Sequence, residues 1–256
     1  MLVYVAGIPG GIIADRFLGQ KKTVMIGGAL LVLGHSILAI DNLTAFYTGL
    51  LFIILGVGGL KPNISTMVGG LYDKNDNRRD IGFKIFYMGI NIGAFLSAII
   101  IGGIGEIYGW HYGFGLAGIG MLFGQMVFMW GQKYLIGVGD FIGTVDNPDK
   151  ELINKPLTNI EKDRIKVLLL SFLIVIVFWG AFEQAGGLMN IYAFEKTNRL
   201  IESISFEVPA TWFQSLNAGF IVLFAVIVGT FWSWWKSLGK ESSLLFQMAV
   251  GVIIMA

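Results

Sequence analysis

Long stretches without a charged residue are the feature that most constrains this chain. Several runs of 18 or more residues contain no Asp, Glu, Lys or Arg, among them Thr23–Ile40, Ile85–Gly105, Tyr112–Gln132 and Val208–Trp235. A helix of about 20 apolar residues crosses the roughly 30 Å hydrocarbon core of a bilayer. Only 14% of the chain is charged, whereas 55% is apolar. The sequence therefore predicts an all-α membrane protein that crosses the bilayer several times.

One long polar segment separates two groups of spans. Residues 133–166 hold six basic and six acidic residues and two Xaa-Pro pairs, a composition typical of a linker. Near its end, Thr158 and Glu161 have the spacing of a capping box, which predicts that a helix begins there. The predicted domains are a first helix bundle over residues 1–132, the linker over 133–166 and a second bundle over 167–256.

The distribution of Lys and Arg predicts the orientation of the spans. If the loop at residues 14–22 is cytoplasmic, 15 of the 18 Lys and Arg residues fall on that side. The opposite loops then hold only Lys196 and Arg199. Because loops rich in Lys and Arg remain in the cytoplasm, this orientation is favoured and the linker is expected to be cytoplasmic.

Lys61 is the one charged residue in Leu43–Tyr72, a stretch of 30 residues. A helix of that length reaches about 45 Å, so Lys61 can lie deep in the membrane. A cation there costs about 2.5–3.5 kcal/mol and by default marks a functional site. Alternatively, the helix ends at Gly59 and Lys61 extends from its cytoplasmic end to the polar interface. This stretch alone leaves both interpretations open.

The helix that begins near Thr158 is expected to run through Val167–Phe194, where Glu183 is the one charged residue. Glu183 lies 17 residues after Lys166 and 12 before Glu195, so an interfacial position is disfavoured. Trp179 lies four residues before it and is expected on the same helix face. Desolvation disfavours the anionic form of a carboxyl group, whereas a nearby cation favours it. Glu183 is therefore predicted to exchange protons as a partner charge arrives and leaves.

Other polar residues are weaker candidates. Asn91 lies in a span, and its amide is equally suited to bind a neighbouring helix or a substrate. Three more polar residues lie at depth in their spans, where each alone more often packs than binds: Tyr4, Gln214 and Asn217. The loop at residues 11–22 joins a helix-packing glycine, Asp15, Arg16 and a basic cluster, an order that favours a functional loop over an ordinary hairpin.

Several function classes lack support in this sequence. Two His and no Cys cannot form a zinc site without carboxylate ligands. The motifs H-E-x-x-H, G-x-S-x-G and G-x-x-x-x-G-K-[ST] do not occur, so metalloprotease, serine hydrolase and P-loop activities are not indicated. The net charge of +1 does not favour nucleic-acid binding. We therefore expect no enzymatic activity, no metal and no nucleic-acid partner.

The polar motifs together resemble a known transporter family. The loop at residues 11–22 looks like the hairpin motif between helices 2 and 3 of the major facilitator superfamily. Four further motifs resemble the proton-dependent oligopeptide transporter family: Gly58-Gly59-Leu60-Lys61-Pro62-Asn63, Phe86-Tyr87-x-x-Ile90-Asn91-x-Gly93, Phe178-Trp179-x-x-x-Glu183-Gln184 and Trp212-Phe213-Gln214-x-x-Asn217. By the family's count, the chain holds part of helix 2 through part of helix 9 of the usual 12. Both ends are expected to be truncated, since Met1–Ile13 and Ser242–Ala256 are too short to span.

The resemblance implies a proton-coupled symporter of di- and tripeptides that works by alternating access between two bundles. Protons would be the coupling ion, with no other cofactor. The protein would be a monomer in a bacterial inner membrane. The residues implied to bind the peptide are Tyr4, Lys61, Asn91, Trp179 and Asn217. Proton coupling would involve Lys61 and Glu183, and a cytoplasmic gate would involve Asp15 and Arg16.

The chain departs from the family pattern at several points. The Glu-x-x-Glu-Arg motif of helix 1 and helices 10 to 12 are absent, Phe182 stands where some members have a second carboxylate, and Ala218 stands where a Pro is usual. Residues 133–166 are too short and polar for the two extra helices that many bacterial members have there. Two alternatives stay open: symport of another small anion such as nitrate, and a non-transporting membrane protein.

Overall fold

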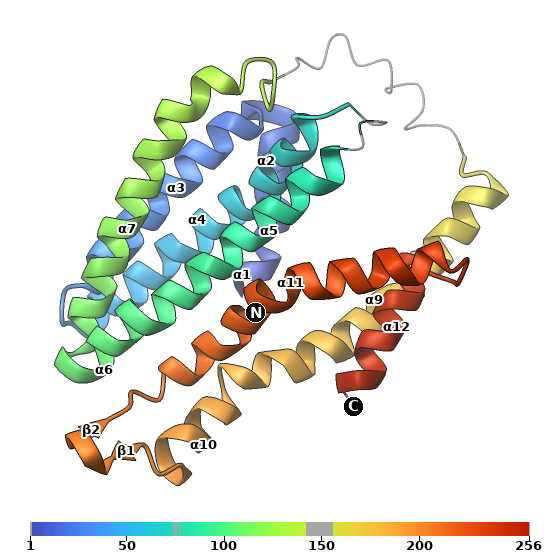
Figure 1. Cartoon of the computed structure of the whole chain (residues 1–256). Helices are drawn as coiled ribbons and strands as arrows, with labels where there is room; N and C mark the ends of the chain where they lie inside the picture. The colour runs from blue at the N-terminus through green and yellow to red at the C-terminus, as the bar shows by residue number, and fades with distance from the viewer. Residues whose placement is uncertain (1, 74–75, 77, 142–155, 256) are drawn as a thin grey trace. The chain divides into compact units, whose positions relative to one another are not determined.

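The computed structural model describes residues 2–73, 76, 78–141 and 156–255. The described chain is almost entirely helical and divides into two compact units, Met1–Ile153 and Asn154–Ala256 (Figure 1). Among the described residues, six helical segments are long and apolar enough to cross a membrane: Gln20–Leu38, Leu43–Gly70, Arg78–Tyr108, Trp110–Tyr134, Asn159–Lys196 and Trp212–Ser237. The all-α membrane fold predicted from the sequence is confirmed. Residues 142–155 of the expected linker lie outside the described residues.

The first unit consists of helices. Its α-helices are α1 (Leu2–Val5), α2 (Gly7–Ile13), α3 (Gln20–Leu38), α4 (Leu43–Gly70), α5 (Arg78–Ser97), α6 (Gly103–Tyr108) and α7 (Trp110–Gly131). Two π-helical turns, Ala14–Leu18 and Ala98–Gly102, and a 3₁₀ turn, Gln132–Tyr134, continue α2, α5 and α7. The helix α3 packs against both α4 and α7 (Figure 1).

Glycines set the close spacing of α3 and α4. A Cβ added at Gly27 would lie 2.7 Å from the carbonyl oxygen of Gly56, and one at Gly49 would lie 2.8 Å from the carbonyl oxygen of Gly34. Membrane helices gain little from the hydrophobic effect between them, so they associate by backbone approach over small residues. The glycine-rich run around Gly56 therefore serves helix packing.

The helix α4 continues through Pro62 to Gly70. Pro62 has no N–H to donate, but membrane helices tolerate such a residue where neighbouring groups make other hydrogen bonds. The helical bond that Pro62 cannot make is the one to the Gly58 carbonyl oxygen. The adjacent Asn63 side chain adds bonds beside this point, to the carbonyl oxygens of Gly59 at 2.8 Å and of Gly10 on α2 at 3.4 Å. The interpretation in which the helix ends at Gly59 is therefore wrong. Lys61 lies nine residues before the end of α4, or about 14 Å along the helix axis.

The segment after α7 folds back onto the loop before α3. Lys21 forms an ion pair with Asp140 (Nζ to Oδ1, 2.7 Å), and the Lys21 N–H donates to the carbonyl oxygen of Gly139 at 2.9 Å. The hydrogen bond from Lys21 lowers the pKa of Asp140. Gly19 has φ +78°, and a Cβ there would lie 2.6 Å from the Phe141 nitrogen, so glycine is required at this approach. The beginning of the expected linker is thus attached to the first unit.

The second unit contains helices and a small hairpin. Its elements are α9 (Asn159–Phe182), α10 (Leu188–Lys196), β1 (Leu200–Ile201), β2 (Phe206–Glu207), α11 (Trp212–Ser237) and α12 (Leu244–Met255). The two strands pair antiparallel within the segment expected to be a polar outer loop. The predicted capping box is confirmed: the Thr158 hydroxyl accepts from the Glu161 N–H, and the Glu161 carboxylate accepts from the Thr158 N–H at 2.7 Å. The first turns of α9, residues 159–166, belong to the expected linker.

The expectation of one continuous helix over Val167–Phe194 is wrong. The helix α9 ends at Phe182, a 3₁₀ turn follows over Glu183–Ala185, and α10 begins only at Leu188. Two glycines lie between the helices, and Gly187 has φ −101° and ψ −96°, outside the helical region. Glycine is a poor helix former, so two in succession permit the interruption.

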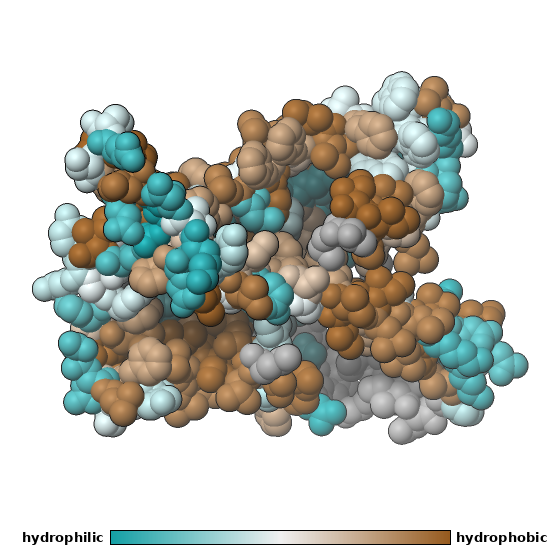
Figure 2. All heavy atoms as spheres, turned by 90° about the horizontal axis from the view of Figure 1, so that it is seen from below, coloured by the Kyte–Doolittle hydropathy of each residue, from teal (hydrophilic) through white to brown (hydrophobic). Residues whose placement is uncertain are grey.

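Large apolar side chains cover much of the surface. Figure 2 shows hydrophobic residues over most of the visible face, with hydrophilic side chains gathered in patches. Val226 on α11 is 70% exposed and Ile253 on α12 is 74% exposed. Soluble proteins rarely expose apolar surface so extensively, whereas side chains that face lipid are apolar.

Candidate functional site

Two of the predicted site residues meet in the first unit. The Lys61 ammonium group lies over the Tyr4 ring, with Nζ 4.8 Å from the ring centroid, where α1 contacts α4. Both side chains are exposed. The negative face of an aromatic ring attracts a cation, so the Tyr4 ring stabilises the Lys61 ammonium group in this position. An ammonium group beside a phenol hydroxyl offers the donors that a carboxylate accepts.

Asn91 lies on α5 and is buried. Its side-chain amide donates to the carbonyl oxygen of Tyr87 at 2.8 Å, one turn earlier in the same helix. Among the described residues, this hydrogen bond lies within α5 and does not reach a neighbouring helix. Its contact with a substrate stays a prediction.

Asp15 and Arg16 lie in the π-helical turn Ala14–Leu18 and are both exposed. Their loop is held in place by Gly19 and Lys21 through the segment after α7. The two charges are therefore presented by a firmly attached loop. Their role in a gate stays a prediction.

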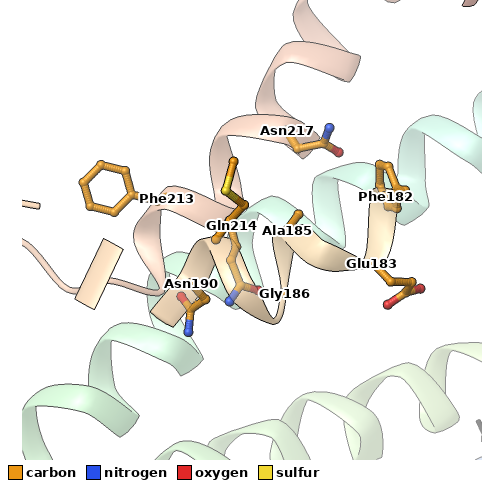
Figure 3. Close-up of a pocket in the computed structure, with 9 residues that line it drawn as sticks. Phe182, Glu183, Ala185, Gly186, Asn190, Phe213, Gln214 and Asn217 are labelled. Atoms are coloured by element: carbon orange, nitrogen blue, oxygen red, sulfur yellow. The ribbon is translucent and has the colours of Figure 1, made fainter. Parts of the chain in front are cut away.

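The second unit contains a cavity of about 450 Å³ beside the interruption between α9 and α10 (Figure 3). Its lining residues come from the end of α9, the 3₁₀ turn and the glycine after it, α10 and α11: Phe182, Glu183, Ala185, Gly186, Met189, Asn190, Phe213, Gln214 and Asn217. The predicted residues Glu183 and Asn217 both line it. One carboxylate and three amides in an otherwise apolar cavity can donate to and accept from a polar ligand. We call this space the amide cavity.

Trp179 lies apart from the amide cavity. Its ring packs edge-on against that of Phe182, with centroids 5.3 Å apart, and it lines a second cavity of about 310 Å³ with Met248 of α12. Glu183 keeps helical geometry with respect to Trp179, because its N–H donates to the Trp179 carbonyl oxygen and its φ of −65° is helical. The two side chains nevertheless line different cavities, so their contribution to one site stays a prediction.

Two residues that line the amide cavity are stronger candidates for ligand binding than the sequence indicated. Asn190 was not a candidate, and Gln214 was only a weak one. The Asn190 Oδ1 atom is buried and has no hydrogen-bond partner among the described residues. A buried acceptor without a donor is costly, so it suits a ligand or a water molecule that donates. The spacing of three between Gln214 and Asn217, on one face of α11, was the available signal.

The sequence model of the POT family matches residues 21–140 and 150–256. Among curated proteins, the uncharacterized transporter YclF of Bacillus subtilis is 34% identical, and the peptide transporter YePEPT of Yersinia enterocolitica is 33% identical. A di-/tripeptide transporter of Lactococcus lactis subsp. cremoris is 31% identical. Each comparison covers 99% of this chain, whereas the chain spans only 61 to 62% of these relatives.

Solved structures show the same likeness. A POT family transporter in complex with a thioalcohol-conjugated peptide has a TM-score of 0.83 at 29% identity, over 98% of this chain and 62% of that one. The peptide transporter POT in complex with sulfate has a TM-score of 0.73 at 31% identity, over 92% and 58%. The family match covers well over half of the whole chain, and the solved POT family structures have the same fold. This chain therefore belongs to the POT family, a family of multi-pass membrane transporters.

Proposed function

We propose that the protein carrying this sequence is a proton-coupled symporter of di- and tripeptides that works by alternating access. The observation that carries the proposal is Glu183, a carboxylate at a helix interruption within a long apolar span, beside the amide cavity. Family membership supports transport as the activity, and the names of two relatives support peptides as the substrate class.

The proposed roles follow from the chemistry of each group. Lys61, with the Tyr4 ring beneath its ammonium group, binds the peptide carboxylate. Asn91 and Trp179 contact the peptide, and Asn217 bonds its polar backbone groups. Glu183 takes up and releases the proton, since a carboxyl group changes charge when it does so. Asp15 and Arg16 act at the cytoplasmic gate. A proton and a peptide enter from outside, the bundles change their orientation, and both leave to the cytoplasm.

The substitution Glu183→Gln tests the coupling. Glutamine keeps the shape and the hydrogen-bonding capacity of the side chain but cannot carry a proton on and off. In proteoliposomes, the Glu183→Gln protein should exchange labelled dipeptide at an appreciable rate yet fail to accumulate it under an inward proton gradient. Glu195→Gln is the matched control, because Glu195 is an exposed acid on α10 outside the amide cavity. Normal proton-driven accumulation by Glu183→Gln would contradict the role.

Lys61→Ala examines the binding of the peptide carboxylate. This variant should lose driven uptake. A dipeptide amide lacks the carboxylate, and it should compete with labelled dipeptide no more strongly in Lys61→Ala than in the wild-type protein. Unchanged transport by Lys61→Ala would show that the cation serves only the helix.

A small-anion symporter is the second candidate. It is favoured by Lys61, a cation within a span, and by the solved peptide transporter POT in complex with sulfate, a small anion. Uptake of labelled dipeptide that is abolished by unlabelled dipeptide but not by nitrate would favour peptide transport. The reverse result would favour the anion.

A further inference from the structure

The buried residues of the second unit gather near the end of α10, just before α11 and in the first turns of α11. The described residues of this unit that are buried all lie between positions 193 and 218: Ala193, Pro209, Ala210, Thr211, Ser215 and Ala218. The helices on either side expose most of their side chains instead. A loop expected to face outside would ordinarily be the least packed part of such a chain. This packing therefore requires a cause.

Arg199 lies in the same stretch of the chain, between Ala193 and Pro209. Its side chain is only 8% exposed and makes an ion pair with Glu207 of β2 at 2.7 Å. Another guanidinium nitrogen donates to the carbonyl oxygen of Val208 at 2.7 Å, and the group lies 5.1 Å from the ring centroid of Phe194 on α10. The Val208 N–H in turn donates to the Arg199 carbonyl oxygen at 2.9 Å. One side chain thus contacts the end of α10 and the segment that leads into α11.

The hairpin extends this connection to α11 itself. The Phe206 ring of β2 lies against the Trp212 ring, the first residue of α11, with centroids 5.8 Å apart. The contacts of Arg199 and of the hairpin therefore lie close in sequence to two residues of the amide cavity. Phe194 lies four residues after Asn190, and Trp212 lies two residues before Gln214. Asn190 and Gln214 line the amide cavity from α10 and α11 (Figure 3).

We propose that Arg199 is a positioning residue of the transport site, which holds the outer ends of α10 and α11 together so that Asn190 and Gln214 bind the same peptide. The inference rests on the proposed function for its substrate and adds two peptide-binding amides and the residue that aligns them. Asn190 offers its buried oxygen to a peptide N–H, and Gln214 bonds a second polar group of the backbone.

The guanidinium group is specific to this task. Its planar, forked donors reach a carboxylate and a carbonyl oxygen at once while its face lies against a ring. A lysine ammonium keeps the charge but cannot make all three contacts in one geometry. Arg199→Lys should therefore restore only part of what Arg199→Met loses.

Uptake kinetics test the proposal. Arg199→Met should raise the KM for a dipeptide about two- to tenfold, the loss expected for one or two misplaced hydrogen bonds, with little change in the maximal rate. Asn190→Ala should raise the KM similarly and should add little when combined with Arg199→Met, because both act on the same contact. Lys196→Met is the matched control, since Lys196 is an exposed cation at the end of α10, and its KM should equal that of wild type.

A distance measurement separates this proposal from the proposed function. This chain contains no cysteine, so Glu195→Cys on α10 and Leu216→Cys on α11 introduce its two spin-label sites, and the protein without these two substitutions gives the background. Arg199→Met should broaden or lengthen that distance, whereas Lys196→Met should not. If the wild-type protein moves no dipeptide, the proposed function fails and the distance still tests the connection between the helices.

Other outcomes overturn the proposal. A KM within twofold of wild type in Arg199→Met, or an unchanged distance, shows that Arg199 does not align the cavity. Additive effects of Arg199→Met and Asn190→Ala show that they act independently. Where Arg199→Met fails to reach the membrane, Arg199→Lys and Glu207→Gln are measured instead. An unchanged KM in both of these variants has the same meaning.

Discussion

Lys61 and Arg199 show two ways in which this chain accommodates a cation. Lys61 lies within a long membrane helix, remains exposed and has the ring of Tyr4 beside it. Arg199 is almost fully buried, and its guanidinium group is bonded to a carboxylate and a carbonyl oxygen. A buried charge is tolerated where it is paired and hydrogen-bonded, whereas an exposed one remains free to bind a ligand. The difference in burial therefore favours a binding role for Lys61 and an aligning role for Arg199.

Tyr4 provides a test at the residue scale. A cation over an aromatic ring at an exposed site gains about 0.5–1 kcal/mol, which corresponds to about a two- to fivefold change in affinity. Tyr4→Leu removes the ring and should raise the KM for a dipeptide by that factor. Tyr4→Phe keeps the ring and should stay close to wild type in the same uptake assay. If Tyr4→Phe is as impaired as Tyr4→Leu, the hydroxyl group and not the ring is the important feature.

Among the helices, glycine contacts determine which pairs approach closely. The helices α2 and α4 meet at Gly10, where an added Cβ would collide with the carbonyl oxygen of Gly58. By contrast, a Cβ added at Gly7 of the same helix meets nothing within 4 Å. The contrast distinguishes a glycine needed for packing from one that is not.

Gly10→Ala should therefore destabilise the first unit. Alanine favours a helix over glycine by about 1 kcal/mol, but overpacking of this kind costs about 1–3 kcal/mol and forces α2 away from α4. We expect a lower Tm in detergent for Gly10→Ala, and an equal or higher Tm for the matched variant Gly7→Ala. Equal Tm values for Gly10→Ala and wild type would mean that α2 and α4 can move apart without any loss of stability, which would contradict the prediction.

For the whole molecule, the charge distribution determines how the chain crosses the membrane. With 15 of 18 Lys and Arg residues on one side, we expect the hairpin after α10 to face outside and the loop after α11 to face the cytoplasm. In intact cells, a membrane-impermeant maleimide should label Ser203→Cys in the hairpin but label Lys240→Cys only after permeabilisation. The cysteine-free wild-type chain is the control. Labelling of Lys240→Cys alone in intact cells would reverse the orientation.

The relatives also bear on the whole molecule. The alignment with YclF extends over 302 residues, more than the 256 of this chain, so the relative has additional residues within the matched stretch. The family match is interrupted at residues 141–149, inside the expected linker. This agrees with the expectation that residues 133–166 are too short for the extra helices of many bacterial members.

The sequence by itself determined the class of the protein, the positions of its spans, the capping box at Thr158 and the resemblance to its family. These properties depend on hydropathy along the chain and on neighbours a few residues apart, which a single sequence displays. Family motifs also singled out Lys61 and Glu183 as charges within apolar spans. Their chemistry could be proposed before any geometry was available.

The tertiary structure alone decided where those side chains lie. It showed that α4 continues past Pro62, that α9 ends at Phe182, and that Trp179 and Glu183 line different cavities. It also brought Arg199 into contact with Phe194, Glu207 and Val208, within a segment that had only the composition of a polar loop. The direction of a side chain and the packing of a loop depend on contacts between elements. Hydropathy and spacing along one chain do not contain that information.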